Sequence, residues 1–310
     1  MDNKIKVCFL TWHYKDAETF LHLLKKMTPG QSGQWKNIEA VTDPFKADFS
    51  IIMDGCNEKY PKDRSIFFCQ HPYVPDGLSP AFKAYSDTSC LISFNSENHL
   101  NPGEWWINHD WDTLMRLEAT NKTKKLACIM THQNHNRIYT QRVEFMKAFS
   151  RVYKDYDLYG RPEENFRLEP EFKKVYRGSL GMNNYDGYLG QHFIGKEVIG
   201  DYRYSLEFDV GPTRNYISER FYDAMLLWTM PIYFGSNNVH EHLPRESFHY
   251  VNINDLTDIN KVVSIVDSDS RETSIKAISE ARYRLLNEYQ IWAMVHYIVN
   301  NLDKYPIRKF

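Results

Sequence analysis

The chain has 310 residues, a formal net charge of −2 and an apolar share of 42%, which is ordinary for a globular protein. This length exceeds the usual range for one domain and predicts two domains, each with its own core. No dense run of Lys and Arg occurs, which argues against a protein that binds long nucleic acid through its phosphate backbone.

The cysteines and the N-terminus favour a reducing compartment. Five cysteines are scattered along the chain, and none of them forms a Cys-x-x-Cys pair. The first apolar run, over residues 4–11, comes too early and is too short for a signal peptide, and no stretch has the length of a membrane span. We therefore expect a cytoplasmic protein.

Short apolar runs bounded by turn residues open the chain. They predict buried strands over residues 4–11, 47–53, 65–69 and 90–94. Residues 16–27 carry apolar side chains at helical spacing and predict an amphipathic helix after the first strand. This order of elements indicates a parallel α/β sheet.

The same rhythm restarts after a polar stretch, residues 105–125, which we interpret as the connection between two lobes. Beyond it, the sequence predicts strands over 126–130, 156–159, 204–208 and 231–234, helices through 142–149 and over 217–228, and a long irregular connection over 160–196. We therefore expect a first lobe over 1–122, a second lobe over 123–290 and a C-terminal helix within 291–310 that crosses back onto the first lobe.

The helix that begins near Tyr216 carries the strongest chemical signal. Its first turn points unpaired N–H groups and the positive end of its dipole toward any cleft in front of it, an arrangement that attracts phosphate. Ser218, Glu219 and Arg220 lie in this turn, where the guanidinium group can bind phosphate oxygens and the carboxylate can accept hydrogen bonds from ribose hydroxyls. The alternative is purely structural: Glu219 complements the dipole, Arg220 is a solvated charge and Tyr216 packs the turn.

Two groups of residues resemble the donor-binding motif of the α-1,3-fucosyltransferase family. The first group keeps the family spacing without a gap and comprises Tyr202-Arg203-Tyr204, Phe208-Asp209-Val210, Tyr216-Ile217-Ser218-Glu219-Arg220 and residues 230–235. The second comprises the strand at 127–131, Arg142, and Asp157-Leu158-Tyr159-Gly160. The resemblance covers residues 126–256, with three departures: Arg220 replaces a Lys, Asp209 replaces a Glu and Val210 replaces an Asn.

The resemblance implies a GT-B fold, in which two Rossmann-like lobes face a cleft. The first lobe would bind the acceptor and the second a nucleotide-sugar donor, similar to GDP-fucose. The implied donor-binding residues are Arg142, Asp209, Tyr216, Ser218, Glu219 and Arg220. It also implies transfer with inversion in one displacement, in which guanidinium groups rather than a metal cofactor stabilise the leaving diphosphate.

The catalytic base is less clear because Gln70 stands where the family has a carboxylate. A glutamine amide cannot accept a proton usefully, so the role must pass to a neighbour. His71, Asp54 and Asp16 are the candidate bases in that order, since each follows a predicted strand at the edge where α/β sheets bind ligands. Each also has a structural interpretation, as a turn residue or, for Asp16, as a helix cap.

Three functions stay open on the sequence. The first is a glycosyltransferase that acts on a glycan hydroxyl. The second keeps the donor site but uses another hydroxyl acceptor, such as a hydroxylated DNA base in a viral or microbial pathway; residues 1–120 carry 12 basic and 16 acidic side chains, a net charge of −4 that disfavours it. The third is a non-catalytic nucleotide- or glycan-binding module.

Overall fold

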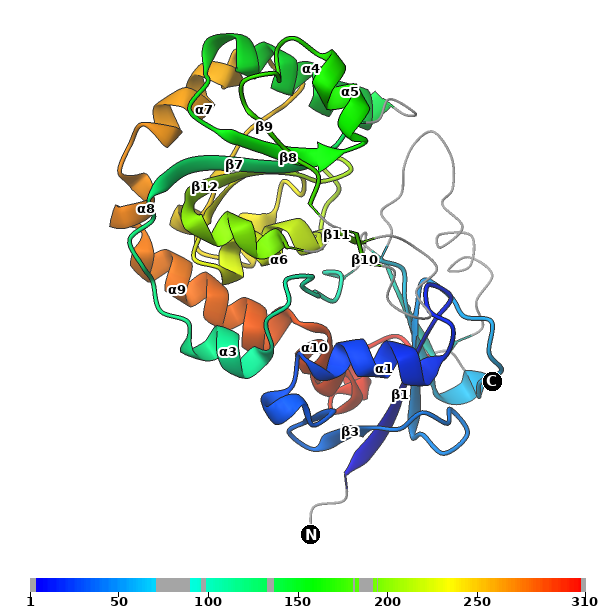
Figure 1. Ribbon diagram of the computed structural model, residues 1–310. Helices are drawn as coiled ribbons and strands as arrows, with labels where there is room; N and C mark the ends of the chain where they lie inside the picture. Colours follow the sequence, from blue (N-terminus) through cyan, green and yellow to red (C-terminus); the bar gives the residue numbers. More distant parts are fainter. Residues whose placement is uncertain are drawn as a thin grey trace.

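The computed structural model describes residues 4–70, 90–95, 99–132, 137–180, 182–183, 192–193 and 195–307, with only the backbone at 182–183 and 192–193. Two six-stranded sheets dominate these residues. The first lies in the blue part of Figure 1 and the second in the green and yellow part, with α3 and α9 running between them. The expectation of two sheets, each with parallel strands, is confirmed.

The first sheet has the strand order β2-β3-β1-β4-β5-β6. Only β2 is antiparallel to its neighbour, β3. Its strands are β1 (Ile5–Thr11), β2 (Gln34–Trp35), β3 (Ile38–Ala40), β4 (Phe49–Met53), β5 (Ser65–Phe68) and β6 (Ile92–Phe94). Helix α1 (Ala17–Lys25) follows β1 and begins at the N-cap Asp16.

The second sheet is entirely parallel, with the order β14-β13-β12-β7-β8-β9. Its strands are β7 (Lys124–Thr131), β8 (Asp157–Arg161), β9 (Tyr176–Gly178), β12 (Tyr202–Phe208), β13 (Met230–Phe234) and β14 (His249–Tyr250). Counted within this sheet the order is 6-5-4-1-2-3, the doubly wound Rossmann arrangement. The strand order reverses between β7 and β12, and at this switch point such folds bind ligands in the crevice beside the carboxyl ends of the strands.

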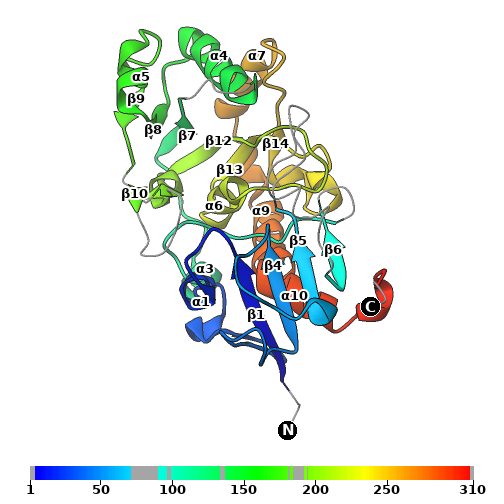
Figure 2. The same ribbon diagram turned by 90° about the vertical axis from the view of Figure 1, so that its right-hand side faces the viewer.

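Helices cover both sheets (Figures 1 and 2). They are α3 (Trp111–Arg116), α4 (Arg137–Val152), α5 (Glu163–Leu168), α6 (Glu219–Leu226), α7 (Asp258–Val266), α8 (Ser270–Thr273), α9 (Ile275–Arg284) and α10 (Ile291–Val299). Short 3-10 turns are η1 (Pro29–Gln31), η2 (Lys62–Arg64), η3 (Lys196–Asp201), η4 (Val239–Glu241), η5 (Arg245–Ser247) and η7 (Leu302–Lys304), and η6 (Leu285–Tyr289) is a π-helical turn. A small antiparallel pair joins β10 (Met182–Asn183) to β11 (His192–Phe193).

Two parts of the chain differ from the expectation. Helix α3 lies in the stretch that we interpreted as an aperiodic connection. It has only six residues and buries Leu114 alone, so its sequence shows no helical period. Helix α6 begins at Glu219, two residues later than expected, because the backbone of Ser218 is extended rather than helical and its side chain accepts the Arg220 N–H. Ser218 is the N-cap.

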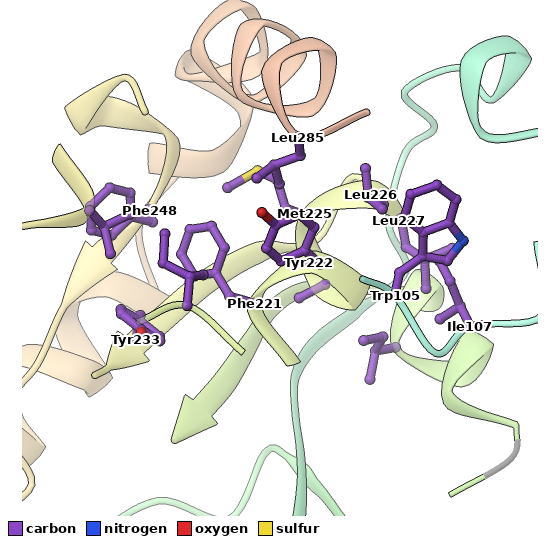
Figure 3. Packing of buried hydrophobic residues seen from close by; sticks show 14 of the residues in the cluster. Trp105, Ile107, Phe221, Tyr222, Met225, Leu226, Leu227, Tyr233, Phe248 and Leu285 are labelled. Atoms are coloured by element: carbon purple, nitrogen blue, oxygen red, sulfur yellow. The ribbon is translucent and has the colours of Figure 1, made fainter. Parts of the chain in front are cut away.

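The apolar face of α6 fixes where its N-terminus lies. Figure 3 shows Phe221, Tyr222 and Met225 packed among side chains from other elements, including Leu285. The ring of Phe221 lies edge-on to that of Tyr233 at 5.0 Å. Because this face is fully buried, the helix cannot rotate or slide without exposing aromatic surface, and its first turn is held at the crevice.

The C-terminal helix α10 lies against the first lobe, although it follows the second in sequence. Trp292 donates from its indole N–H to the Leu24 carbonyl at 2.9 Å and packs edge-on against Phe9 at 4.8 Å. Since Trp292 is completely buried, this contact ties the two lobes together through the end of the chain.

Candidate functional site

A cavity of about 200 Å³ opens between the two lobes. The first lobe contributes residues at the carboxyl ends of β1, β4 and β5, among them Asp54 and Gln70. The second lobe contributes residues 216–220, the loop and first turn of α6. The strand order thus places groups that are distant in sequence around one space.

A second cavity of about 160 Å³ lies at the switch point of the second sheet. It is lined by the ends of β7 and β12, where Thr131 and Phe208 lie, and it shares Trp106, Glu219 and Arg220 with the interlobe cavity. Because these two spaces adjoin, together they reach the size of a small-ligand pocket, about 300–1,000 Å³.

Arg142 projects from α4 into the switch-point cavity. Its side chain is 3% exposed, and its Nε and Nη2 atoms have no hydrogen-bond partner among the described residues. Burial and the nearby charge of Arg220 lower the pKa of Arg142 to about 10. Buried charges are normally paired, so this guanidinium group is suited to an anion that enters the cavity.

Arg220 lies in the first turn of α6 and reaches both cavities. Its Nη1 lies 3.5 Å from Glu219 Oε1, which is also 3.6 Å from Lys196 Nζ, and Lys196 pairs with Asp223 at 2.7 Å. Although burial alone would lower the pKa of Arg220, the Glu219 and Asp209 carboxylates raise it above its ordinary value. Arg220 therefore keeps its charge inside the site.

The other predicted donor-binding residues divide into two layers. Tyr216 and Ser218 line the interlobe cavity, and Ser218 Oγ accepts the Arg220 backbone N–H at 3.3 Å. Asp209 lies behind them, fully buried, where it accepts hydrogen bonds from Ser218 and from Tyr233 at 2.5 Å. Its position suits a role in holding the loop rather than in touching a ligand.

The candidate bases are in different places. Asp54 lines the interlobe cavity, with Oδ1 accepting the Gln70 N–H at 2.6 Å and Oδ2 lying 3.3 Å from His13 Nε2. Asp16 is outside the lining and caps α1, where hydrogen bonds from Thr19 lower its pKa. His71 lies outside the described residues.

Glu104, Trp106, Lys196 and Glu207 are among the lining residues that were not predicted. Glu207 is 3% exposed and accepts a hydrogen bond from Ser205, and burial raises its pKa to about 8. A charged residue inside the apolar strand β12 was a usable signal for Glu207. Glu104 and Trp106 lie in an irregular segment and Lys196 begins the short turn η3, so no periodicity marks which of these side chains face a cavity.

Two kinds of feature are absent from the described residues. They contain no group of three or more His, Cys, Asp or Glu side chains that could hold a metal ion. They also contain no helix with the length and apolar character needed to cross a membrane.

Two Rossmann-like lobes around such a crevice define a GT-B glycosyltransferase, and the chain has this fold and this class of activity. Residues 119–275, half of the chain, match the model of glycosyltransferase family 10 (fucosyltransferase), C-terminal part. The chain belongs to this family, as the donor motif predicted. No curated protein matches the chain significantly by sequence.

Solved structures share the architecture at low sequence identity. An α1,3-fucosyltransferase with GDP-fucose is 14% identical, with a TM-score of 0.44, and the match covers 93% of this chain and 92% of that chain. A point mutant of T4 phage BGT in complex with UDP-glucose is 12% identical, with a TM-score of 0.51 and coverage of 96% and 100%. Anabaena Alr3699/HepE with UDP-glucose is 7% identical, with a TM-score of 0.53 and coverage of 97% and 100%.

Proposed function

We propose that this protein transfers a sugar from a nucleoside-diphosphate sugar to an acceptor hydroxyl, with inversion and without a metal. The observation that carries the proposal is the buried Arg142 guanidinium group, whose Nε and Nη2 are unpaired among the described residues. It lies beside Arg220 and the α6 N-terminus, so a diphosphate would meet two cations and a favourable dipole together.

The same groups account for metal independence. The leaving diphosphate gains charge as the glycosidic bond breaks, and preorganised cations aimed at that charge stabilise the transition state. Arg142, Arg220 and Lys196 all line the switch-point cavity. Family membership makes GDP-fucose the first donor to test, and the UDP-glucose complexes of the T4 phage and Anabaena proteins make UDP-glucose the second.

We propose a glycan hydroxyl as the acceptor, in keeping with the family. A hydroxylated DNA base is the second candidate, since the DNA-modifying enzyme β-glucosyltransferase has a similar fold, with a TM-score of 0.53 at 12% sequence identity. The net charge of −4 over residues 1–120 favours the glycan. Transfer to DNA would fall steeply with added salt, whereas transfer to a neutral glycan would not.

The test begins with labelled GDP-fucose and UDP-glucose and measures release of the nucleoside diphosphate. Arg220→Met is expected to weaken binding of that nucleotide about 10- to 100-fold, because one charge-assisted contact contributes about 1.5–3 kcal/mol. The matched control is Arg214→Met, which removes an exposed cation that pairs with Glu241. Equal affinity in both variants, or no nucleotide release from either donor, would refute the proposal.

A further inference from the structure

The resemblance implies a carboxylate as catalytic base at position 70, where this chain has Gln70. Other acidic side chains of the interlobe cavity can take that role. Asp54, Glu104 and Glu219 all line it. The base must be able to reach the acceptor hydroxyl next to the donor, and its surroundings must not, on balance, hold it in the charged form. These two requirements separate the three residues.

Asp54 and Glu219 are already engaged. Both oxygens of Asp54 have contacts, with the Gln70 N–H at 2.6 Å and His13 Nε2 at 3.3 Å, and the residue is 1% exposed. Glu219 lies within 3.6 Å of two cations, Lys196 and Arg220. A carboxylate stabilised in its charged form in this way is a weak proton acceptor.

Glu104 is held beside the donor loop from both sides. Upstream, Asn101 exchanges hydrogen bonds with Ile217, at 2.8 and 3.0 Å. Downstream, the backbone N–H of Trp106 donates to Asp223 Oδ1 of α6 at 2.7 Å. The backbone on either side of Glu104 is therefore in fixed register with the first turn of α6, where the donor phosphates are proposed to bind.

Gln70 supports the same segment directly. Its Nε2 donates to the Pro102 carbonyl at 3.0 Å, two residues before Glu104. A glutamate at position 70 could not make this bond, because a carboxylate has no N–H to donate. Gln70 thus holds the segment that carries the Glu104 carboxylate into the cavity.

We propose that Glu104 is the catalytic base and that Gln70 is a positioning residue that holds the Glu104 segment. This inference rests on the proposed function. The Glu104 carboxylate takes the proton of the acceptor hydroxyl while the acceptor oxygen bonds to the anomeric carbon. The bond from that carbon to the diphosphate breaks, its electron pair leaves with the nucleoside diphosphate, and the proton later passes from Glu104 to solvent.

The electrostatic setting of Glu104 suits this step. Burial raises the pKa of Glu104, the Trp106 side chain opposes this rise by donating a hydrogen bond, and the Glu219 charge adds to it, while Lys26 and His13 act in the opposite direction. A raised pKa makes a carboxylate a better proton acceptor near neutral pH. It also predicts that kcat rises with pH as Glu104 loses its proton.

The experiment measures hydrolysis of GDP-fucose, or of UDP-glucose where the wild-type protein uses that donor, because an attacking water must lose a proton just as an acceptor does. Glu104→Gln keeps the shape of the side chain and is expected to lower kcat about 10²- to 10⁴-fold. It should also abolish the rise of kcat with pH, while Kd for GDP or UDP changes less than about twofold, as expected when a base is lost without donor binding energy. Glu104→Asp should keep the pH rise at a reduced kcat.

Gln70→Ala is the test of positioning. It should lower kcat and retain both the pH rise and the affinity for the nucleotide. Full kcat in Glu104→Gln would overturn the proposal, and so would loss of the pH rise in Asp54→Asn with retention in Glu104→Gln. A wild-type protein that binds neither GDP nor UDP would instead refute the proposed function, so the two failures can be told apart.

Discussion

Replacing Arg142 by Met should make the protein more stable and at the same time greatly weaken its binding of nucleotide. The pKa of Arg142 is lowered to about 10 by burial and by Arg220, which disfavours its charged form by roughly 3 kcal/mol. Methionine fills similar space without that cost. In the nucleotide complex the sign reverses, since two charge-assisted hydrogen bonds of about 1.5–3 kcal/mol each would be lost, which corresponds to roughly 10²- to 10⁴-fold weaker binding.

Urea denaturation without nucleotide and calorimetric titration with GDP and UDP would measure these two effects. Arg282→Met is the matched control, because burial also lowers the pKa of Arg282, to about 9, whereas its guanidinium group donates to the Leu226 and Leu114 carbonyls at 3.0 and 2.8 Å. Loss of Arg282 removes both of these charge-assisted hydrogen bonds and should destabilise the protein by about 2 kcal/mol or more. If Arg142→Met also destabilised the unliganded protein and still bound nucleotide, the reasoning would be wrong.

Three further outcomes follow from the site. Folding raises the pKa of Glu207 from 4.5 to about 8, so between these pH values the folded chain keeps a proton that the unfolded chain has lost, and the free energy of unfolding falls as pH rises. Glu207→Gln should reduce this fall by a few kcal/mol in urea denaturation at pH 5 and 8. An equal fall in the variant and the wild-type protein would argue against it. Gly103→Ala would bring a Cβ within 2.0 Å of the Tyr222 ring and should cost about 1–3 kcal/mol or more in thermal unfolding, whereas Gly200→Ala, which meets only Leu227 at 3.8 Å, should cost less than about 1 kcal/mol. Treatment with EDTA should leave nucleotide release unchanged, and loss of activity that Mg²⁺ restores would contradict metal independence.

The sequence predicted the parts of the fold that depend on periodic burial. The four expected strands of the first lobe match β1, β4, β5 and β6, and the expected helix after the first strand matches α1. These elements bury apolar side chains in regular succession, and that pattern is local. The two-residue strand β2 and the six-residue helix α3 were missed because they are too short to show a period.

That Tyr216, Ser218, Glu219 and Arg220 line one cavity was predictable for a different reason. Tyr216, Ser218, Glu219 and Arg220 are contiguous or nearly so and lie at a helix start, so one stretch of sequence specifies their common position. Glu104 could not be found in this way. It lies in an irregular segment, and its place in the cavity depends on long-range bonds such as that between Gln70 and the Pro102 carbonyl.

A structure of the protein with GDP or UDP bound would test the central claim most directly. We expect the diphosphate oxygens to lie within hydrogen-bond distance of Arg142 Nε and Nη2, of the Arg220 guanidinium group and of the first backbone N–H groups of α6. A nucleotide seated elsewhere, with both Arg142 nitrogens still lacking a partner, would contradict the account.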